Sequence, residues 1–264
     1  MHSNRSYISS MLAAVCTVLF GMEGSGMTLG KIGSTNLMYH GLTAKDYILD
    51  GLTAMWDGVE NAGFGHRQTG SIVWKDLVGS HDLSTTVPNQ YYWTDNSLHF
   101  DGLNTSLDHR GMECSTISMA YFEIVAVKRG VNTSVFAQNG GRSANNLLLW
   151  QYYNFGSCLA HNGAAQRFPS GTIKKDVPLT MGVTVGTSTP ELFVNGAKIT
   201  PSSSADGWSV YNVFSLFANS LSKNGGYNNG AEKEIYNARC YSRFLTAAEI
   251  AANHAVDKAR FNLP

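Results

Sequence analysis

The residues best suited to catalysis are two glutamates, Glu232 and Glu234, in the run AEKEIY. Two residues apart on a strand, their side chains share one face. Paired carboxylates about 5–5.5 Å apart serve as acid and nucleophile in retaining glycoside hydrolysis. Charged side chains are also typical of a solvated strand edge, and we interpret the pair in this second way. A hydrolase would lose activity in Glu234→Gln or Glu123→Gln.

Other catalytic patterns are missing from the sequence. It has no Gly-x-Ser-x-Gly turn, and its runs NGGRS and NGGYNNG lack the flanking strand and lysine-bearing helix of a phosphate-binding loop. The histidines are scattered through loops rich in Gly and Asn. Surface or turn positions are predicted for His66, His81, His99, His109 and His161. The sequence therefore predicts that the chain is not an enzyme.

One stretch, FDGLNTSLD, could bind a metal ion. Asp101, Asn104 and Asp108 supply oxygen ligands at the short spacing of a calcium loop, although the same residues form turns without metal. We expect no cofactor, with Ca²⁺ left open. The four cysteines include no C-x-x-C pair, which argues against zinc. They are interpreted as buried thiols, and a Cys114–Cys240 disulfide is left open.

Aromatic side chains offer a different kind of site. Sugars stack their C–H-rich faces on aromatic rings, while amides and hydroxyls bond to the sugar hydroxyls, and no net charge is needed. Alternation along the strands must turn some of these rings into the core. The predicted glycan-binding residues are Trp150, Tyr152, Asn154, Tyr92, Trp93 and Trp208.

The charge of the chain excludes two classes of partner. Its 264 residues include 19 Lys and Arg and 19 Asp and Glu, so the net charge at pH 7 is zero. Nucleic acids and anionic membranes are bound through an excess of positive charge, and we expect neither as a partner. The low charged fraction of 14% and the 27 glycines are typical of a turn-rich β protein with a neutral polar surface.

The elements that would position these residues are mostly strands. From Leu52 onward, short apolar runs alternate with turn residues, as in a β-sandwich. The run TISMAYFEIVAVKRG is apolar on both faces, which predicts a central, covered strand. Asn195-Gly196 predicts a two-residue type I′ hairpin, because both residues tolerate positive φ.

The C-terminal run EIYNARCYSRFLTAAEIAANH changes period without an intervening Gly or Pro. Its first half alternates as a strand, and Tyr236 and Tyr241 are expected on opposite faces. Thr246 and Glu249 have the spacing of a capping box, so a helix is predicted to begin there and to cover exposed sheet. Thr43 is predicted to cap a short helix before the first strand.

Residues 1–48 are predicted to form an N-terminal arm, and residues 49–264 a single domain. The apolar run from Met11 to Met22 has the layout of a secretory signal peptide and is too short to span a membrane. Its apolar residues also form one stripe of an amphipathic helix, which could dock on another subunit. Both interpretations stay open.

Five stretches carry a family resemblance: LTAMWDGVENAG, WKDLVGSHDL, SLHFDG, LTMGVTVGTSTPELFVNGAKI and IYNARCYSRFLTAAEIAANHAVDKARF. As a set, covering residues 50–262, they resemble the laminin-G-like branch of the concanavalin A-like lectin/glucanase superfamily, of the type found in gut-bacterial surface loci and prophages. The family's closing run matches Tyr241, Arg243, Leu245, Thr246, Glu249 and Ile250 residue by residue. The resemblance implies an all-β jelly-roll sandwich of two antiparallel sheets, to which the sequence adds an N-terminal helical arm and a short C-terminal helix.

The function implied by these observations is recognition rather than catalysis. Hydrolytic members of that superfamily carry a Glu-x-Asp-x-x-Glu run that this sequence lacks, and the matched motifs belong to the scaffold. We predict a non-catalytic glycan-recognition or adhesion module, extracellular on a bacterial surface or in a phage virion. Its predicted partners are a cell-surface carbohydrate and, through the arm, other subunits. The alternatives are a structural subunit that binds no sugar and a glycoside hydrolase.

Overall fold

The computed structural model divides the chain into two units, Met1–Leu42 and Thr43–Pro264. The fold is that of the second unit. The structure describes residues 42–60, 72–85, 88–101, 111–115, 117–129, 134–139, 147–152, 157–161, 165–167, 169, 171–187, 190–200, 204–205, 213–216 and 232–264. The predicted helix or signal segment around Met11 to Met22 lies outside these residues.

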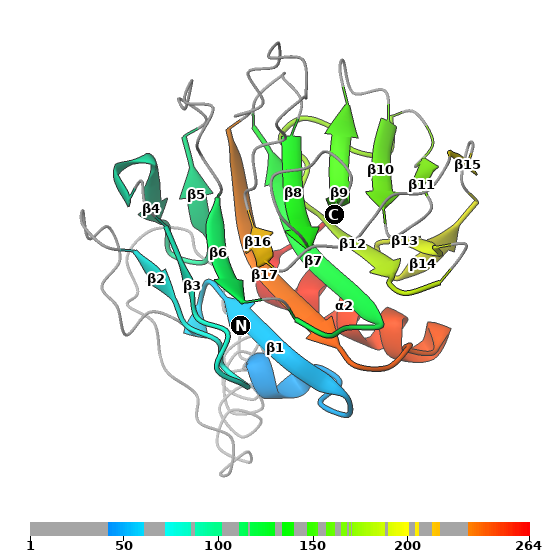
Figure 1. Ribbon diagram of the computed structural model, residues 1–264, viewed down its shortest axis with the longest axis horizontal. Coiled ribbons are helices and arrows are strands. Elements are labelled where there is room, and N and C mark those ends of the chain that lie inside the picture. Colours follow the sequence, from blue (N-terminus) through cyan, green and yellow to red (C-terminus); the bar gives the residue numbers. More distant parts are fainter. Residues whose placement is uncertain are drawn as a thin grey trace, which may run out of the picture. The chain divides into compact units, whose positions relative to one another are not determined.

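Thr43–Pro264 is a sandwich of two antiparallel sheets, which confirms the predicted all-β class (Figure 1). In the described residues, sheet A has eight strands. In spatial order they are β14 (Ala197–Ile199), β13 (Leu192–Val194), β12 (Leu179–Thr184), β7 (Tyr121–Lys128), β17 (Lys233–Tyr241), β5 (Leu98–Phe100) and β4 (Tyr91–Trp93), with β1 (Leu52–Asp57) also paired to β17.

Sheet B has nine strands within the described part of the chain. They are β15 (Ser204–Ala205), β11 (Ala165–Arg167), β10 (Ser157–His161), β9 (Leu147–Tyr152), β8 (Ser134–Asn139), β16 (Val213–Leu216), β6 (Met112–Ser115), β3 (Leu83–Ser84) and β2 (Val73–Trp74). The helical elements of the described residues are α2 (Ala247–Phe261) and the short 3₁₀ turns η1 (Ala44–Asp46) and η3 (Pro88–Gln90).

Aromatic side chains join the two sheets. Trp56 of sheet A stacks on Phe214 of sheet B, with ring centroids 5.2 Å apart, and Phe122 meets the same ring edge-on at 5.8 Å. All three side chains are fully buried. The inner faces of both sheets therefore form one core.

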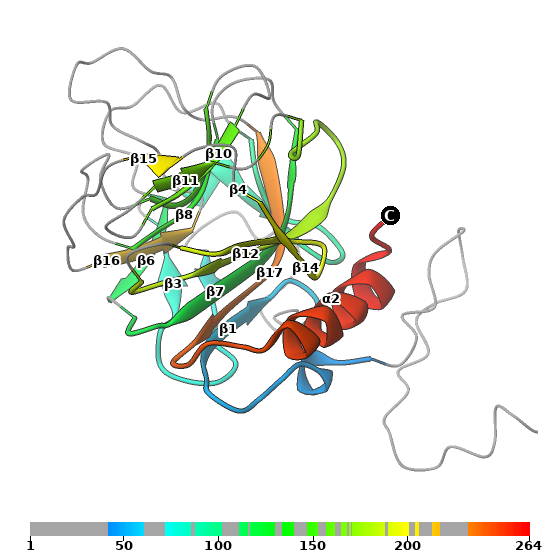
Figure 2. The same cartoon turned by 90° about the vertical axis from the view of Figure 1, so that its right-hand side faces the viewer.

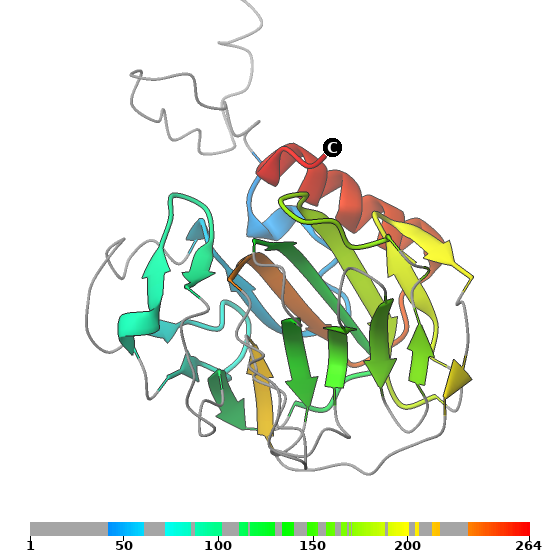
Figure 3. The ribbon, with the colours of Figure 1, turned by 90° about the horizontal axis from the view of Figure 1, so that it is seen from above.

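The outer face of sheet A is covered in part by α2 (Figure 2). Seen from above, α2, sheet A and sheet B follow one another as three layers (Figure 3). Strand β7 lies between β12 and β17, and all eight of its residues are buried. The prediction of a central strand covered on both faces is confirmed.

Three predictions from local sequence signals are confirmed, one hairpin turn and two helix caps. Asn195 and Gly196, between β13 and β14, have φ of 49° and 78°, as a type I′ turn requires. A Cβ on Gly196 would lie 2.9 Å from Cβ of His254 in α2, so the turn also needs glycine for space. Thr246 caps α2, and Thr43 caps η1, each in a capping box.

Strand β17 contains a β-bulge that its alternating sequence does not predict. The register with β7 shifts between Ile235 and Asn237, so Tyr236 is an extra residue. Tyr236 packs on Phe261, and Tyr241 packs in a cluster with Ile250, so both tyrosines face α2. Their predicted placement on opposite faces is wrong, because the bulge interrupts the alternation.

Candidate functional site

Among the described residues, the outer face of sheet A carries two groups of polar side chains, and both include residues of β17. The first group, here the covered network, lies beneath α2 and contains Asp57, Glu123, Asn237, Arg239, Asn253, Asp257 and Arg260. The second group, here the open cluster, is Tyr92, Ser97, His99, Arg129, Asp176, Glu232, Glu234 and Tyr236.

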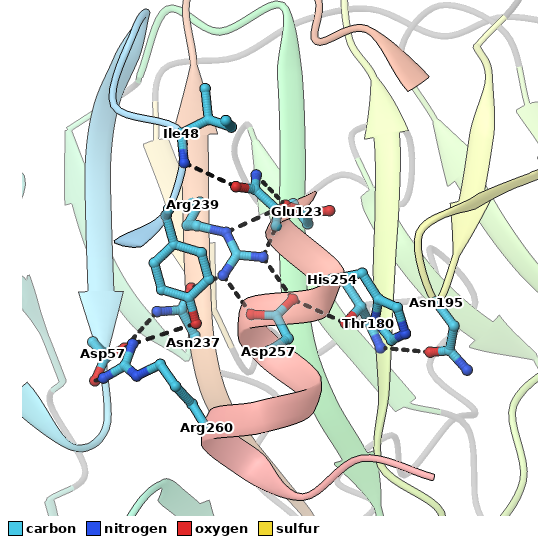
Figure 4. A network of polar contacts seen from close by, with 12 residues as sticks. Ile48, Asp57, Glu123, Thr180, Asn195, Asn237, Arg239, His254, Asp257 and Arg260 are labelled. Atoms are coloured by element: carbon cyan, nitrogen blue, oxygen red, sulfur yellow. Dashed lines mark hydrogen bonds and ion pairs between the residues drawn. The ribbon is translucent and has the colours of Figure 1, made fainter. Parts of the chain in front are cut away.

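Arg239 is the centre of the covered network (Figure 4). Its Nη1 donates to Asp257 Oδ1 at 2.6 Å, and its Nη2 donates to Glu123 Oε2 at 2.8 Å. The side chain is completely buried, and both carboxylates are at most 1% exposed. The ring of Tyr47 lies 4.0 Å from the guanidinium carbon, a cation–π contact that also excludes water.

A second arginine extends the network toward β1. Arg260 of α2 donates to both oxygens of Asp57, at 2.6 and 3.1 Å, and Asn237 donates to Asp57 at 2.7 Å. The network therefore ties the helix to strands β1, β7 and β17.

The electrostatics of Glu123 are those of a buried structural group. Burial raises the pKa of its carboxyl, and Asp257 raises it further, while Arg239 lowers it. Because Glu123 is completely buried, a substrate cannot reach it. Glu123 is therefore excluded as the acid of a hydrolytic site.

Glu234 is the centre of the open cluster. Arg129 donates to both its oxygens, from Nε at 3.1 Å and from Nη2 at 3.3 Å, and Tyr236 donates its hydroxyl at 3.1 Å. His99 Nδ1 lies 3.2 Å from the same carboxylate. Burial alone would raise the pKa of Glu234, but the hydrogen bonds from His99 and Arg129 outweigh it and lower the pKa to about 2.

His99 connects this carboxylate to an aromatic surface. Its Nε2 lies 3.3 Å from Glu232 Oε1, so the imidazole stands between two carboxylates. The ring of Tyr92 stacks on the imidazole, with centroids 4.3 Å apart and planes 24° apart. Tyr92 is 43% exposed, whereas His99 is 4% exposed. A buried imidazole thus supports an exposed ring.

Arg129 links the cluster to a loop from elsewhere in the chain. Its Nη1 donates to Asp176 Oδ1 at 3.4 Å. Asp176 has φ of 59°, a left-handed conformation that few residues other than glycine adopt, and its side chain is 52% exposed. The cluster therefore ends in a solvent-facing carboxylate.

The predicted glycan-binding residues do not lie together in one site. Tyr92 lies exposed in the open cluster. Trp93 is 4% exposed and packs edge-on against Trp74 at 5.4 Å, so its ring belongs to the core and offers no face to a sugar. Trp150 and Tyr152 lie on β9, opposite Leu159 and Ser157 of β10. Asn154 and Trp208 lie outside the described residues, so glycan binding there stays a prediction.

Most residues of the open cluster were not predicted from the sequence as site residues. His99 was predicted at a surface or turn position, but it is buried in the middle of β5. Glu234 was interpreted as part of a solvated edge, but its side chain is 13% exposed and held by several donors. One signal was present: with Tyr91, Trp93, Leu98 and Phe100 on the core side, alternation places Tyr92 and His99 together on the other face.

Metal and thiol chemistry has less support. In the part of the chain that the structure describes, no three His, Cys, Asp or Glu side chains come together to hold an ion. Asn104 and Asp108 lie outside that part, so calcium binding stays a prediction. Cys114 and Cys240 are free thiols, and burial raises the pKa of Cys114 to about 12. Among the described helices, none is long and apolar enough to cross a membrane.

Comparisons with known proteins give a structural likeness alone. No family model matches the sequence, and no curated protein matches it. The sialidase of Trypanosoma rangeli is similar in structure, with a TM-score of 0.55 and 16% identity over 97% of this chain and 40% of the sialidase. Its complex with sialic acid and its covalent intermediate with 2,3-difluorosialic acid each give a TM-score of 0.54 and 16% identity, over 79% of this chain and 33% of theirs.

These neighbours correct one prediction. The chain spans between a third and two fifths of the sialidase, and at this identity the likeness shows the fold. That fold also occurs in a sialidase whose structure was solved as a covalent intermediate. This finding contradicts the prediction that the chain is not an enzyme. The prediction relied on the lack of a local motif, whereas the open cluster shows that the fold assembles carboxylates, an imidazole and an arginine from distant segments.

Proposed function

We propose that the open cluster is a carbohydrate-binding site. The observation that carries this proposal is the exposed ring of Tyr92 stacked on His99, whose Nε2 lies 3.3 Å from the solvent-exposed carboxylate of Glu232. Sugars bind where an aromatic face meets planar polar groups that can bond to their hydroxyls. The likeness to sialidase structures that contain bound sugar supports the proposal at the level of the fold.

The polar groups of the cluster are held in place before any ligand arrives. Glu234 is fixed by Arg129, His99 and Tyr236, and its partners are fixed by it in turn. A rigid site loses less conformational entropy on binding. Glu232, whose side chain is 46% exposed, and Asp176 then present oxygen acceptors to the hydroxyls of a sugar lying on Tyr92.

A glycan array followed by calorimetry on the best binder tests the proposal, in the presence and absence of calcium. Tyr92→Ala is expected to weaken binding about 5- to 150-fold, since the loss of an aromatic contact costs about 1–3 kcal/mol. Phe244→Ala is the matched control, because Phe244 is an aromatic residue 51% exposed on the connection before α2. Equal effects of the two substitutions, or no binding to any glycan, would contradict the proposal.

A second candidate function is hydrolysis of the bound glycoside, favoured by the two carboxylates on either side of His99. Glu234, with its pKa lowered to about 2, stays ionised as a nucleophile or stabilising anion must. Glu232 is exposed enough to exchange protons with a substrate and solvent.

Activity on a panel of aryl glycosides tests this second candidate. Both Glu232→Gln and Glu234→Gln are expected to abolish turnover. Glu191→Gln is the control, because the Glu191 side chain is also 46% exposed and lies on another part of the surface, paired with Lys198. Turnover that survives both glutamine substitutions would exclude the cluster as a catalytic site.

We also propose that the sandwich is a laminin-G-like jelly roll exposed on a bacterial surface or in a virion. The residues of the resembling closing run support this, because they are the ones that join β17 to α2. Arg243 pairs with Glu249 at 2.6 Å, Thr246 caps the helix, and Ile250 packs with Tyr241. Immunogold labelling of intact cells and virions is expected to place the chain on their outer surface. Labelling confined to the cytoplasm would contradict this.

A further inference from the structure

Most hydrogen-bond donors of the open cluster already face carboxylates of the same cluster. All three guanidinium nitrogens of Arg129 donate to carboxylates, two to Glu234 and one to Asp176. Both ring nitrogens of His99 face carboxylates, and the Tyr236 hydroxyl donates to Glu234. A ligand that needs several donors, above all a carboxylate, therefore finds few in this cluster.

The acceptors, by contrast, face solvent. The side chains of Glu232 and Asp176 are 46% and 52% exposed, and each carboxylate has a second oxygen beyond the one nearest its cluster partner. Asp176 is also balanced by Lys175, 3.8 Å away. The negative charge of Glu232 faces only the imidazole among the contacts of the described residues.

The charges around Tyr92 also disfavour an anionic ligand. Burial raises the pKa of its hydroxyl, and so do Glu234, Glu232 and Asp101, while Arg129 is the one cation that lowers it. Three carboxylates thus act on the exposed ring against one guanidinium that is already paired. An anionic ligand lying on this ring would be repelled.

We propose that the open cluster selects glycans by charge and takes a sugar that carries a free amine, with its ring on Tyr92 and its ammonium group at Glu232. This inference rests on the proposed carbohydrate-binding function. It excludes acidic sugars from the site, so the ligand differs in charge from the sialic acid bound in the structurally similar sialidase. The ammonium group supplies both the positive charge and the donors that the cluster lacks.

Three probes of similar size test the proposal by calorimetry at about pH 6, below the pKa of ordinary amines. They are a glucosamine tetramer, the matched N-acetylglucosamine tetramer, and α2,3-sialyllactose. The amine-bearing tetramer is expected to bind about three- to fivefold more tightly than its acetylated counterpart, as one exposed ion pair worth up to about 1 kcal/mol predicts. Sialyllactose is expected not to bind, and added salt is expected to narrow the preference.

Variants assign the preference to Glu232. In Glu232→Gln the two tetramers are expected to bind equally, while Glu191→Gln keeps the preference. Equal binding of the tetramers to the unmodified protein, a preference that survives Glu232→Gln, or sialyllactose binding as tight as either tetramer would each overturn the inference. Absence of all binding, or binding that Tyr92→Ala leaves unchanged, would instead defeat the proposed function.

Discussion

The covered network and the open cluster use the same chemistry on the same strand, and the main difference between them is the helix. Each joins an arginine to carboxylates on the outer face of sheet A, but Arg239 is fully buried beneath α2, whereas the side chain of Arg129 is 31% exposed. A buried ion pair can only stabilise the fold, because no ligand reaches it. An ion pair at the open end of the same face can also meet a ligand.

The two groups also set their carboxyl pKa values in opposite directions. Glu123 is completely buried and shares Arg239 with Asp257, so its pKa is raised. Glu234 receives hydrogen bonds from His99 and Arg129 that outweigh its partial burial, so its pKa falls to about 2. The comparison teaches that complete burial and a neighbouring carboxylate can outweigh the hydrogen bonds from an arginine, so the presence of arginine alone does not decide how firmly each acid stays ionised.

Removal of the central arginine gives the largest expected difference. Arg239→Met leaves Glu123 and Asp257 buried without their cation, which is expected to lower the free energy of unfolding by about 3–5 kcal/mol. Arg129→Met acts on partly exposed groups, where an ion pair contributes about 1 kcal/mol or less. Urea denaturation of both variants measures the difference, and equal losses would break the comparison.

A smaller effect is expected from loosening the cover itself. Thr246→Ala removes the N-cap of α2, which is expected to cost about 1 kcal/mol. Because the open cluster makes its contacts outside the helix start, glycan binding by this variant is expected to stay unchanged. Thermal unfolding and calorimetry on one sample check both statements. Weaker glycan binding would show that the two groups are coupled through the helix.

A third effect depends on pH and concerns acid stability. The folded pKa of Glu234, about 2, lies below its ordinary value of 4.5. Its stabilising contribution is therefore fully present above pH 4.5 and is lost as the pH falls toward 2. The gap in unfolding free energy between the unmodified protein and Glu234→Gln is expected to shrink across that window, as measured by urea denaturation at several pH values. A gap that stays constant from pH 5 to 2 would contradict the assigned pKa.

The sequence predicted the parts of the molecule that depend on neighbours in the chain. Asn195-Gly196 and the Thr246–Glu249 capping box are local signals, and the structure contains both. The open cluster depends instead on contacts between residues more than a hundred positions apart, such as Arg129 with Glu234. No periodicity within one segment carries that information. Alternation predicted that some of the β4 side chains face the core and others the solvent. Without a known orientation of the strand, it could not show that Trp93 faces the core and Tyr92 the solvent.

The extra residue Tyr236 makes β17 behave as two short strands joined end to end. The first half, which pairs with β5, presents Glu234 outward, while Lys233 lies inward, fully buried with its ammonium group 5.3 Å from the Phe100 ring centroid. The second half pairs with β1 and holds Arg239 beneath the helix. Loss of Tyr236 would remove the bulge and place Ile235 directly before Asn237, and these two already pair with the consecutive residues Ala126 and Val125 of β7, so no side chain would change face. The deletion would instead remove the hydroxyl that Tyr236 donates to Glu234 and the packing of its ring on Phe261, so this one inserted residue contacts both the open cluster and the helix.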